Sequence, residues 1–421
     1  MKKLLFISLA VALALSVALV GCTSATQYTL TMASSDGGSV FPAAGKHTYS
    51  AGQVVDLKAT PASEFYQFVN WTGDTTGIAD VNLATTKITM DADASIKANF
   101  ETLPWDSTIT LDFHATMPPY ASLAELVYGP WSEAVNAYTG ANGGKFNIQW
   151  TYGAEPWDES VALEAIGAKI SDGGQINGDQ FKLGTIGYIP FLWDMEQCAY
   201  ATHHLFQSEV AQWDKFGQLN NVRILLSVPL QPAEYWGKVQ VTQLSDLDGV
   251  LVRAEAGEVP TIDALGATPV VGLEIAELAG ALQLGTIQGC FVTYDAGAGF
   301  AGLMRGGATQ FTTEVDLFPR VYVLAINKAV YDGLPAEAKT VLDSFSRPSV
   351  SVQYAAAHYA AAAAAKAEVA ADRTIDTLSD LPAWKAATAG VAAKWVDDMT
   401  ALGFDGQGIY DRALELILAA S

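Results

Sequence analysis

Short runs of alternating apolar and polar residues fill the chain between residues 28 and 100. Gly, Pro, Asn and Asp separate these runs, of which YTLTMA is the first and KITMDADASIKANF the last. A period of two is typical of β-strands that bury one face, and the separating residues favour turns. The pattern predicts a small all-β module, with Trp71 in its core rather than exposed as a sugar-stacking platform.

Beyond a short Pro-containing linker at 102–108, predicted strands and helices alternate to the end of the chain. TITLDFHA, KFNIQWTY, LVR and RVYVLAIN are predicted as strands, and 122–138 and 158–171 as helices. This order favours an α/β domain with parallel or mixed sheets. Residues 351–373 are rich in Ala and free of Gly and Pro, which predicts a helix long enough to cross two lobes.

Residues 1–22 are predicted to be a targeting segment rather than part of the fold. Two lysines precede an apolar run from Leu4 to Val20, which ends in the tetrapeptide LVGC. A basic start and an apolar run are typical of a secretory signal, and this run is short for a membrane span. LVGC resembles the bacterial lipobox, which implies a lipid anchor on Cys22 and an extracytoplasmic protein. A plain transmembrane anchor is the alternative.

Length and charge narrow the function classes. A chain of 421 residues is long enough for two or three domains, and half of its residues are hydrophobic, which allows a large core. Its 23 Lys and Arg against 45 Asp and Glu give a net charge of −22. Because no basic cluster is present, nucleic acid is not expected as a partner, and an anionic ligand must be held by a few local cations. Cys198 and Cys290 have no spacing signature, so two buried thiols are favoured over a disulfide.

Motifs of enzymes and metal sites are absent from the sequence. It contains no HExxH, GxSxG or P-loop, and no GxGxxG before a helix. The adjacent His203 and His204 would point apart on a helix, which is unsuited to chelating one metal. DGGQINGDQ, residues 172–180, lacks the Glu and the spacing of a calcium loop and is predicted as a turn. We therefore expect no catalytic site, no metal and no cofactor.

Two further groups of polar residues have a plain explanation. Glu155, Asp158 and Glu159 could form an acid–base pair, but the solvated N-terminus of a helix explains them equally well. His358, within the long predicted helix, is expected on the helix surface.

Arg253 ends the apolar run VLV in a chain that has only seven arginines. In open α/β sheets, ligands bind outside the carboxyl ends of the strands, so a side chain at this position points into a cleft. The planar guanidinium can bind a carboxylate through two parallel hydrogen bonds. From the residues alone, a carboxylate site and a surface ion pair are equally supported.

The β module resembles the divergent internalin B-type repeat of bacterial surface proteins. The likeness rests on GGSV at 37–40, FVNWTGD at 68–74 and ITMDADASIKANF at 88–100. It implies a β-grasp-like spacer or adhesion unit over residues 28–101, with no chemistry of its own.

The rest of the chain resembles the substrate-binding proteins of TRAP (tripartite ATP-independent periplasmic) transporters, the DctP family. The likeness rests on LDFHATMPPYASLAELVYGPWSEAVNAYTG, IPFLW at 189–193, the block at 239–289 that contains GVLVRAE, and LAINKAVYDGLPAEAKTVL at 324–342. It implies a two-lobed periplasmic-binding-protein fold, class II-like, with hinge strands and a long helix across both lobes. By motif, the arginine with which the family binds a carboxylate falls on Arg253.

One segment departs from the family pattern. Where the family usually continues with DG-EN and a ligand-facing asparagine, this chain has QGCFV at 288–292. The family's second ligand contact therefore cannot be transferred, and we expect a less polar or bulkier ligand than a C4-dicarboxylate. Arg320 is a candidate second cation, with a hinge ion pair as the equally supported alternative. Two or three of five aromatic residues are expected to line the cleft: Tyr120, Trp157, Trp193, Trp236 and Tyr294.

Together the patterns predict a signal peptide at 1–22, a tether at 23–27, a β module at 28–101, a linker at 102–108 and a binding domain at 109–421. The resemblance implies a solute-binding lipoprotein that captures an organic acid between two lobes and delivers it to a TRAP membrane permease. A cell-surface adhesion or ligand-sensing lipoprotein with the same binding fold is the alternative.

Overall fold

The computed structural model describes residues 26–62, 65–193, 195–208, 221–299, 301–304 and 306–420. The predicted signal peptide, with its lipidation position Cys22, lies outside these residues. Two compact units follow one another along the chain and divide between Pro104 and Trp105. This division falls inside the predicted linker.

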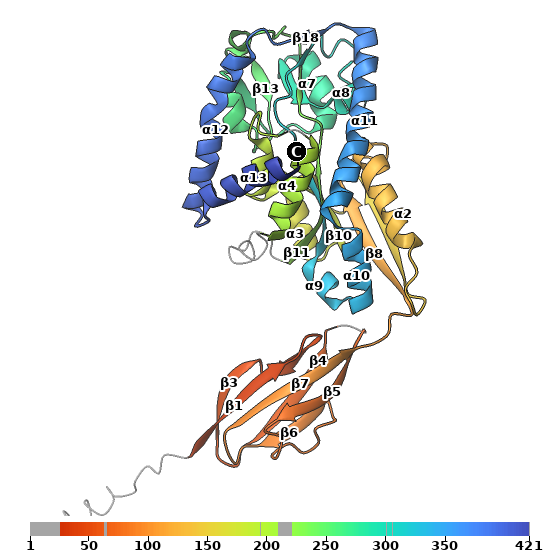
Figure 1. The fold of residues 1–421 in the computed structure, drawn as a ribbon, viewed down its shortest axis with the longest axis vertical. Coiled ribbons are helices and arrows are strands. Elements are labelled where there is room, and N and C mark those ends of the chain that lie inside the picture. Colours follow the sequence, from red (N-terminus) through yellow and green to blue (C-terminus); the bar gives the residue numbers. More distant parts are fainter. Residues whose placement is uncertain are drawn as a thin grey trace, which may run out of the picture. The chain divides into compact units, whose positions relative to one another are not determined.

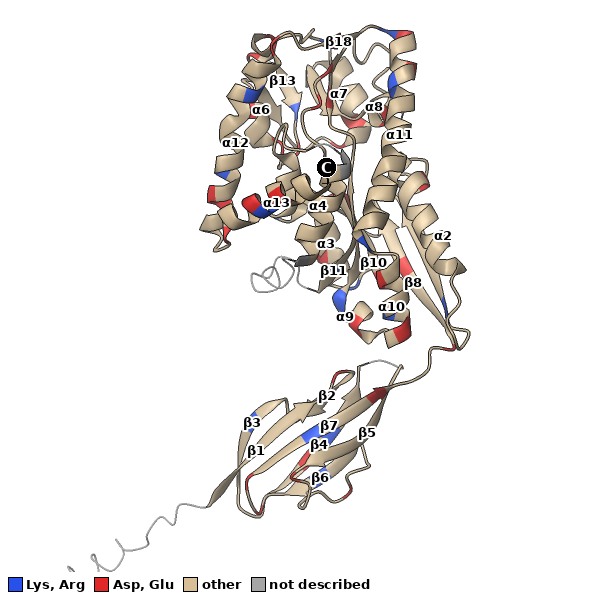
Figure 2. Ribbon diagram, in the orientation of Figure 1, with Lys and Arg blue, Asp and Glu red and all other residues tan. Residues whose placement is uncertain are grey.

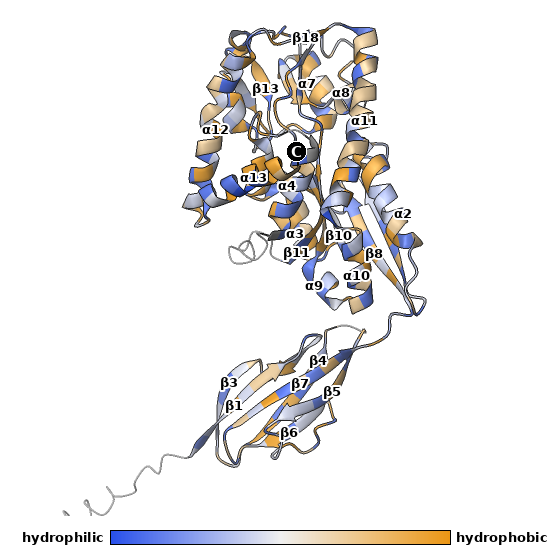
Figure 3. Ribbon diagram, viewed as in Figure 1, coloured by the Kyte–Doolittle hydropathy of each residue, from blue (hydrophilic) through white to orange (hydrophobic). Residues whose placement is uncertain are grey.

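The first unit is an all-β module. Its strands are β1 (Gln27–Ser34), β2 (Gly38–Phe41), β3 (Gly45–Ser50), β4 (Val54–Pro61), β5 (Tyr66–Gly73), β6 (Thr85–Thr89) and β7 (Ala94–Thr102). They form one sheet of order β3-β1-β7-β5 and a second of order β2-β4-β6. Hydrophobic and hydrophilic positions are interspersed along the strands (Figure 3), and the buried ones pack around Trp71, which is 2% exposed. The predicted place of Trp71 in the core is confirmed.

The second unit contains two lobes, each with its own sheet. The sheet of lobe 1 has the order β11-β17-β10-β8-β9. Its strands are β8 (Thr108–Ala115), β9 (Lys145–Tyr152), β10 (Gly173–Asn177), β11 (Val222–Pro229) and β17 (Val321–Asn327). β8 pairs in parallel with β9 and β10, whereas β17 runs antiparallel to β10 and β11. The strands predicted at TITLDFHA, KFNIQWTY and RVYVLAIN are confirmed.

The predicted turn at 172–180 is wrong, because its first half forms the central strand β10. Every residue of β10 is buried. A Cβ on Gly173 would lie 2.6 Å from the carbonyl oxygen of Ala325, and one on Gly174 would lie 2.2 Å from that of His114. The glycines are therefore present because neighbouring backbone approaches too closely for a side chain, not because the chain turns.

The sheet of lobe 2 has the order β14-β13-β15-β12-β16-β18. Its strands are β12 (Glu234–Gly237), β13 (Leu251–Arg253), β14 (Thr268–Val270), β15 (Gly289–Val292), β16 (Phe311–Glu314) and β18 (Ile375–Thr377). β13 pairs in parallel with β14 and β15, so the carboxyl ends of these three strands meet at one end of the sheet.

Helices cover the sheets of both lobes. Those of lobe 1 are η1 (Ala124–Tyr128), α2 (Gly129–Ala137), η2 (Glu159–Val161), α3 (Ala162–Gly167), η3 (Gly178–Gln180), η4 (Gly184–Tyr188), α4 (Met195–Ser208), α9 (Lys328–Gly333) and α10 (Ala336–Ser344). Those of lobe 2 are η5 (Leu244–Leu247), α6 (Val259–Ala264), η6 (Ile275–Glu277), α7 (Leu278–Leu284) and α8 (Tyr294–Ala298). The last three helices are α11 (Pro348–Asp372), α12 (Leu381–Ala401) and α13 (Gly406–Ala420).

Helix α11 and two chain segments join the lobes. The long helix predicted at 351–373 is confirmed by α11, which packs on α4 and β11 of lobe 1 and on α8 of lobe 2. Figure 1 shows α11 and α12 on opposite sides of the lobes. Residues 230–233 and 315–320 cross between the lobes side by side. The backbone N–H of Leu230 donates to Arg320 O at 2.8 Å, and that of Ala233 to Phe318 O at 2.9 Å. We call this pair of segments the hinge.

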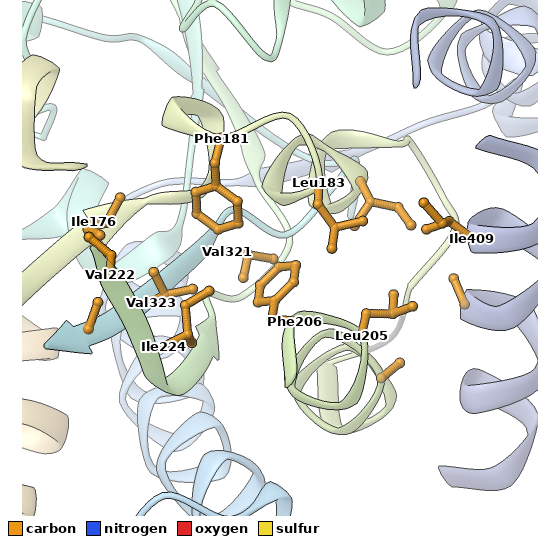
Figure 4. Packing of buried hydrophobic residues seen from close by; sticks show 14 of the residues in the cluster. Ile176, Phe181, Leu183, Leu205, Phe206, Val222, Ile224, Val321, Val323 and Ile409 are labelled. Atoms are coloured by element: carbon orange, nitrogen blue, oxygen red, sulfur yellow. The ribbon is translucent and has the colours of Figure 1, made fainter. Parts of the chain in front are cut away.

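The core of lobe 1 includes the C-terminal helix. Figure 4 shows Ile176 and Val323 from the sheet, Phe206 from α4 and Ile409 from α13 in one buried cluster. Burying an apolar side chain of this size contributes about 1.5–3 kcal/mol, so α13 is an integral part of the lobe.

Two further predictions concern the cysteines and the membrane. Cys198 and Cys290 are both buried and form no disulfide, which confirms the prediction of two buried thiols. Among the described residues, no helix is both long enough and apolar enough to cross a bilayer.

Candidate ligand-binding site

The carboxyl ends of the parallel strands in both lobes face one cleft. A cavity of about 1210 Å³, including space open to solvent, lies between segments that follow β8 and β9 in lobe 1 and β14 in lobe 2. Ligands of open α/β sheets bind at such strand ends. Its wall includes Met117, Tyr120, Glu159, Gln175, Glu274, Ile275 and Tyr322.

Two further cavities adjoin the first, because they share wall residues with it. One, of about 850 Å³, shares Glu159 and Glu274 and reaches Arg253; we call it the charged end of the cleft. The other, of about 420 Å³, shares Met117 and Ile275; we call it the apolar chamber. Its wall also contains Leu123, Leu230, Val292, Asp295, Arg320 and His358.

Arg253 lies at the carboxyl end of β13 and borders the charged end. Its Nε donates to Leu273 O at 3.0 Å, and its Nη1 donates to Glu255 Oε1 at 2.8 Å. No hydrogen bond joins its Nη2 to a described residue. The guanidinium is thus buried and oriented, with one nitrogen left to bind a ligand.

Glu255 is a carboxylate that the chain itself brings to Arg253. Asn177 Nδ2 donates to its Oε2 at 3.2 Å, and the Tyr188 hydroxyl lies 3.0 Å from the same oxygen. Burial alone would raise the pKa of Glu255, but the charges of Arg320 and Arg253 outweigh burial and bring the pKa to about 2. Glu255 is therefore ionised and compensates part of the charge of Arg253.

Arg320 ends the hinge segment 315–320 and is 2% exposed. It forms an ion pair with Glu258, its Nε lies 3.4 Å from Glu255 Oε2, and its Nη2 donates to Phe291 O at 2.7 Å. The structure therefore shows the hinge ion pair, and Arg320 also borders the apolar chamber. Because Arg320 contacts Glu255 as well as Glu258, the two arginines and two glutamates form one buried network.

Two more carboxyl groups in the charged end hold protons near neutral pH. Burial first, and then the charges of Glu255 and Asp179, raise the pKa of Glu159 to about 8. Burial, Glu255 and Glu258 raise the pKa of Asp179 to about 7. The explanation by a solvated helix N-terminus holds for Asp158, whose Oδ1 accepts from Ser160 N at 2.9 Å, but not for Glu159.

Asp295 and His358 form a polar pair in the wall of the apolar chamber. Asp295 Oδ2 lies 3.3 Å from His358 Nε2 and accepts a hydrogen bond from Ser122 of lobe 1. Burial alone would raise the pKa of Asp295, but the hydrogen bond from His358 and its charge hold the pKa below its usual range. The predicted surface position of His358 is wrong: the residue is 1% exposed, because its face of α11 points toward the junction of the lobes.

The structure contradicts the prediction that two or three of five aromatic residues line the cleft. In the cavities described above, Tyr120 alone contributes to a wall, and it is 67% exposed. Trp157 and Trp193 belong to the core cluster of lobe 1, and Trp236 and Tyr294 to a core cluster of lobe 2. A different aromatic residue, Tyr322 on β17, lines both the first cavity and the apolar chamber.

The segment QGCFV contributes apolar wall instead of a polar contact. Gln288 Oε1 accepts from Leu251 N at 3.0 Å, and Cys290 and Phe291 on β15 are fully buried. Val292 and Thr293 border the apolar chamber. This arrangement agrees with the expectation of a less polar ligand.

The described residues contain no group of three or more His, Cys, Asp or Glu side chains placed to hold a metal ion. His203, one of the adjacent histidines, is buried, with its Nδ1 2.8 Å from Ser351 Oγ.

Two family models match the chain. Residues 28–104 match the divergent InlB B-repeat domain, and residues 189–398 match the bacterial extracellular solute-binding protein family 7, DctP. No curated protein matches.

Solved structures of TRAP solute-binding proteins share the fold. One from Rhodoferax ferrireducens, with copurified benzoate, is 23% identical and has a TM-score of 0.66 over 74% of this chain and 98% of its own. A marine metagenome protein with 3-hydroxybenzoate is 21% identical, with a TM-score of 0.67 over 75% and 99%. One from Bordetella bronchiseptica, with bound mandelate, is 18% identical, with a TM-score of 0.65 over 74% and 100%.

The fold and the cleft between two lobes define a solute-binding protein. The chain carries a solute-binding domain of the DctP family of TRAP systems, preceded by a divergent InlB B-repeat. The proteins of this family and the structural neighbours bind solutes for transport and are not enzymes.

Reasoning from the sequence missed the acidic side of the site. Glu255 and Glu258 follow Arg253 by two and five residues, so their spacing was a signal that could have been used. Asn177 and Asp179 were missed because residues 172–180 were predicted as a turn, whereas strand β10 brings both residues to the cleft.

Proposed function

We propose that the two-lobed unit captures an organic acid in the cleft and delivers it to the membrane permease of a TRAP system, while a lipid on Cys22 holds the protein at the outer face of the membrane. The observation that carries the proposal is Arg253, which ends β13, borders the charged end of the cleft and has no hydrogen bond from its Nη2 to a described residue. Charge-assisted hydrogen bonds from a guanidinium to a carboxylate are roughly twice as strong as neutral ones.

The ligands of the relatives support the class of acid. Benzoate, 3-hydroxybenzoate and mandelate each combine one carboxylate with an apolar ring. The cleft of this protein offers a cation at one end and aliphatic walls, such as Leu123 and Val292, at the other. An acid with an apolar body suits both ends, and closure of the lobes strengthens the ion pair by excluding water.

Calorimetric titration of the soluble chain with benzoate, 3-hydroxybenzoate and mandelate tests the proposal. We expect at least one of them to bind with a Kd on the order of 1 μM or below. Arg253→Gln should weaken that binding by about a hundredfold, which corresponds to ~2.7 kcal/mol. The matched control is Arg412→Gln, which removes an exposed arginine paired with Glu415 and should leave the affinity unchanged.

The double variant Arg253→Gln/Glu255→Gln separates ligand binding from folding. It removes both partners of the ion pair, so no unpaired charge is left buried. We expect this variant to fold and to bind the acid as weakly as Arg253→Gln. Affinity within threefold of wild type in the double variant would contradict the placement of the carboxylate at Arg253, and no binding of any of the three acids to the wild type would contradict an aromatic acid as the ligand.

A second candidate, adhesion to the cell surface, rests on the match of residues 28–104 to the divergent InlB B-repeat. This unit has its own buried core around Trp71. Sedimentation of residues 26–104 with purified cell-wall polysaccharide would support adhesion, and no sedimentation would favour a spacer.

A further inference from the structure

Carboxyl groups outnumber cations among the described residues at the charged end of the cleft. Glu159, Asp179, Glu255 and Glu274 line the same cavity as Arg253, the one basic residue among the described residues of that wall. Glu255 already occupies Nη1 of Arg253. A ligand with a carboxylate and no other polar group would therefore bind one nitrogen and face several carboxyl groups.

Gln175 is an independent sign that this part of the cleft needs a donor. Its side chain projects from β10 into the wall of the central cavity and is 2% exposed. Its Oε1 is buried without a hydrogen-bond partner among the described residues. In the same wall, Oε1 of Glu159 also lacks one, while Tyr322 forms a hydrogen bond with the Glu159 carboxyl group. Native proteins rarely leave buried acceptors unpaired, so a bound molecule that donates hydrogen bonds is the natural partner of both.

We propose that the ligand carries a protonated amine in addition to its carboxylate, as an amino acid or another zwitterionic acid does. The carboxylate binds Nη2 of Arg253, and the ammonium group donates to Glu159 and Gln175. This inference rests on the proposed function, because it takes the carboxylate at Arg253 as given. It adds the second functional group by which the cleft selects among organic acids.

The number of protons released or taken up on binding distinguishes a ligand with an amine from one without. Near pH 7, Glu159 is largely protonated and Asp179 about half, because their pKa values are raised to about 8 and about 7. An ammonium ion beside them lowers both pKa values, so binding releases protons; a carboxylate alone raises them, so binding takes protons up. The other ionisable groups that act on this pair are Glu255, Glu258, Glu274, Arg253, Arg320 and Tyr322.

Three pairs of probes that differ by one amine test the proposal. They are L-phenylalanine with 3-phenylpropionate, L-leucine with 4-methylpentanoate, and L-proline with cyclopentanecarboxylate. Each is titrated calorimetrically into the soluble full chain at pH 7 in two buffers of different ionisation enthalpy. In at least one pair we expect the amine-bearing member to bind about 10- to 100-fold more tightly, as for a charged hydrogen bond, with net release of protons.

The variant Glu159→Gln locates the amine. We expect it to reduce the preference for the amine-bearing probe at least fivefold and to reduce proton release. The matched control is Glu125→Gln, an exposed glutamate outside the three cavities, which should change neither. A thermal unfolding curve of each variant checks that it is folded.

The outcomes separate this inference from the proposed function. If the plain acid of each pair binds as tightly as its partner, or takes up protons on binding, the second functional group is wrong and the organic-acid function stands. The placement at Glu159 is wrong if Glu159→Gln keeps the full preference. If neither these six probes nor the three aromatic acids bind, both proposals are overturned.

Discussion

The charged end and the apolar chamber belong to one cleft but are built in opposite ways. At the charged end, loops after β10 and β13 crowd carboxyl groups such as Asp179 and Glu255 around Arg253. In the chamber, aliphatic side chains such as Leu230 and Val292 lie beside the pair of Asp295 and His358. The comparison shows that the charged side chains and the aliphatic side chains of the cleft are concentrated in different parts of it. Figure 2 shows that charged residues are otherwise scattered along the helices of both lobes.

The largest expected effect comes from breaking the buried network behind the charged end. Arg320→Met removes the nearer of the two cations paired with buried Glu258, which costs about 3–5 kcal/mol of unfolding free energy. Arg412→Met removes an exposed ion pair and should cost at most about 1 kcal/mol. Urea unfolding curves of the two variants measure the difference. Equal losses in both would show that the network contributes no more than a surface pair.

The two ends should respond to pH in opposite directions. The pKa of Glu159 is raised in the folded state, so its contribution to stability is present at low pH and is lost as pH rises through about 8. From pH 7 to 9 this loss amounts to about 1 kcal/mol. Glu234, the first residue of β12, has a pKa that burial and Asp316 raise to about 8, and it adds a similar loss. The pKa of Asp295 is lowered, so its contribution is present at neutral pH and is lost in acid.

Denaturant unfolding of two variants across the pH range checks this contrast. Glu159→Gln should reduce the loss of unfolding free energy between pH 7 and 9 and leave the loss below neutral pH unchanged. Asp295→Asn should reduce the loss of unfolding free energy in acid and leave the loss between pH 7 and 9 unchanged. If Glu159→Gln loses as much unfolding free energy between pH 7 and 9 as the wild type, this carboxyl group is not protonated in the folded protein at neutral pH.

The smallest expected effects distinguish the wall of the cleft from the core. Tyr120→Ala should weaken binding of the tightest aromatic acid by a few-fold, because stacked or edge contacts contribute about 0.5–1.5 kcal/mol. Trp236→Phe, in the core of lobe 2, should leave the affinity within twofold while lowering the unfolding temperature. A larger loss of affinity in Trp236→Phe than in Tyr120→Ala would restore Trp236 as a ligand-binding residue.

The sequence carried enough information for several strands, for the long helix and for the place of Arg253 at the end of a strand. These follow from periodicity, Ala content and the rule that ligands meet the ends of buried strands, all of which are local properties. Trp71 was placed correctly for the same reason, since it lies in an alternating strand of a small module.

The aromatic residues, His358 and β10 could not be placed by such local rules. Trp193 and Trp236 are large and apolar whether they face a core or a cleft, and only packing against distant segments decides between the two. His358 is buried because α11 passes the junction of the lobes, and Gly174 stands in a strand because His114 approaches from another one. Each outcome depends on a contact between residues far apart in the chain.

A crystal structure of the protein with its tightest-binding acid tests the central claim most directly. We predict the carboxylate of the ligand about 2.8 Å from Arg253 Nη2, with the apolar body directed toward Val292 and the lobes closed around it. A ligand carboxylate bound elsewhere, with no contact to Arg253, would contradict the account.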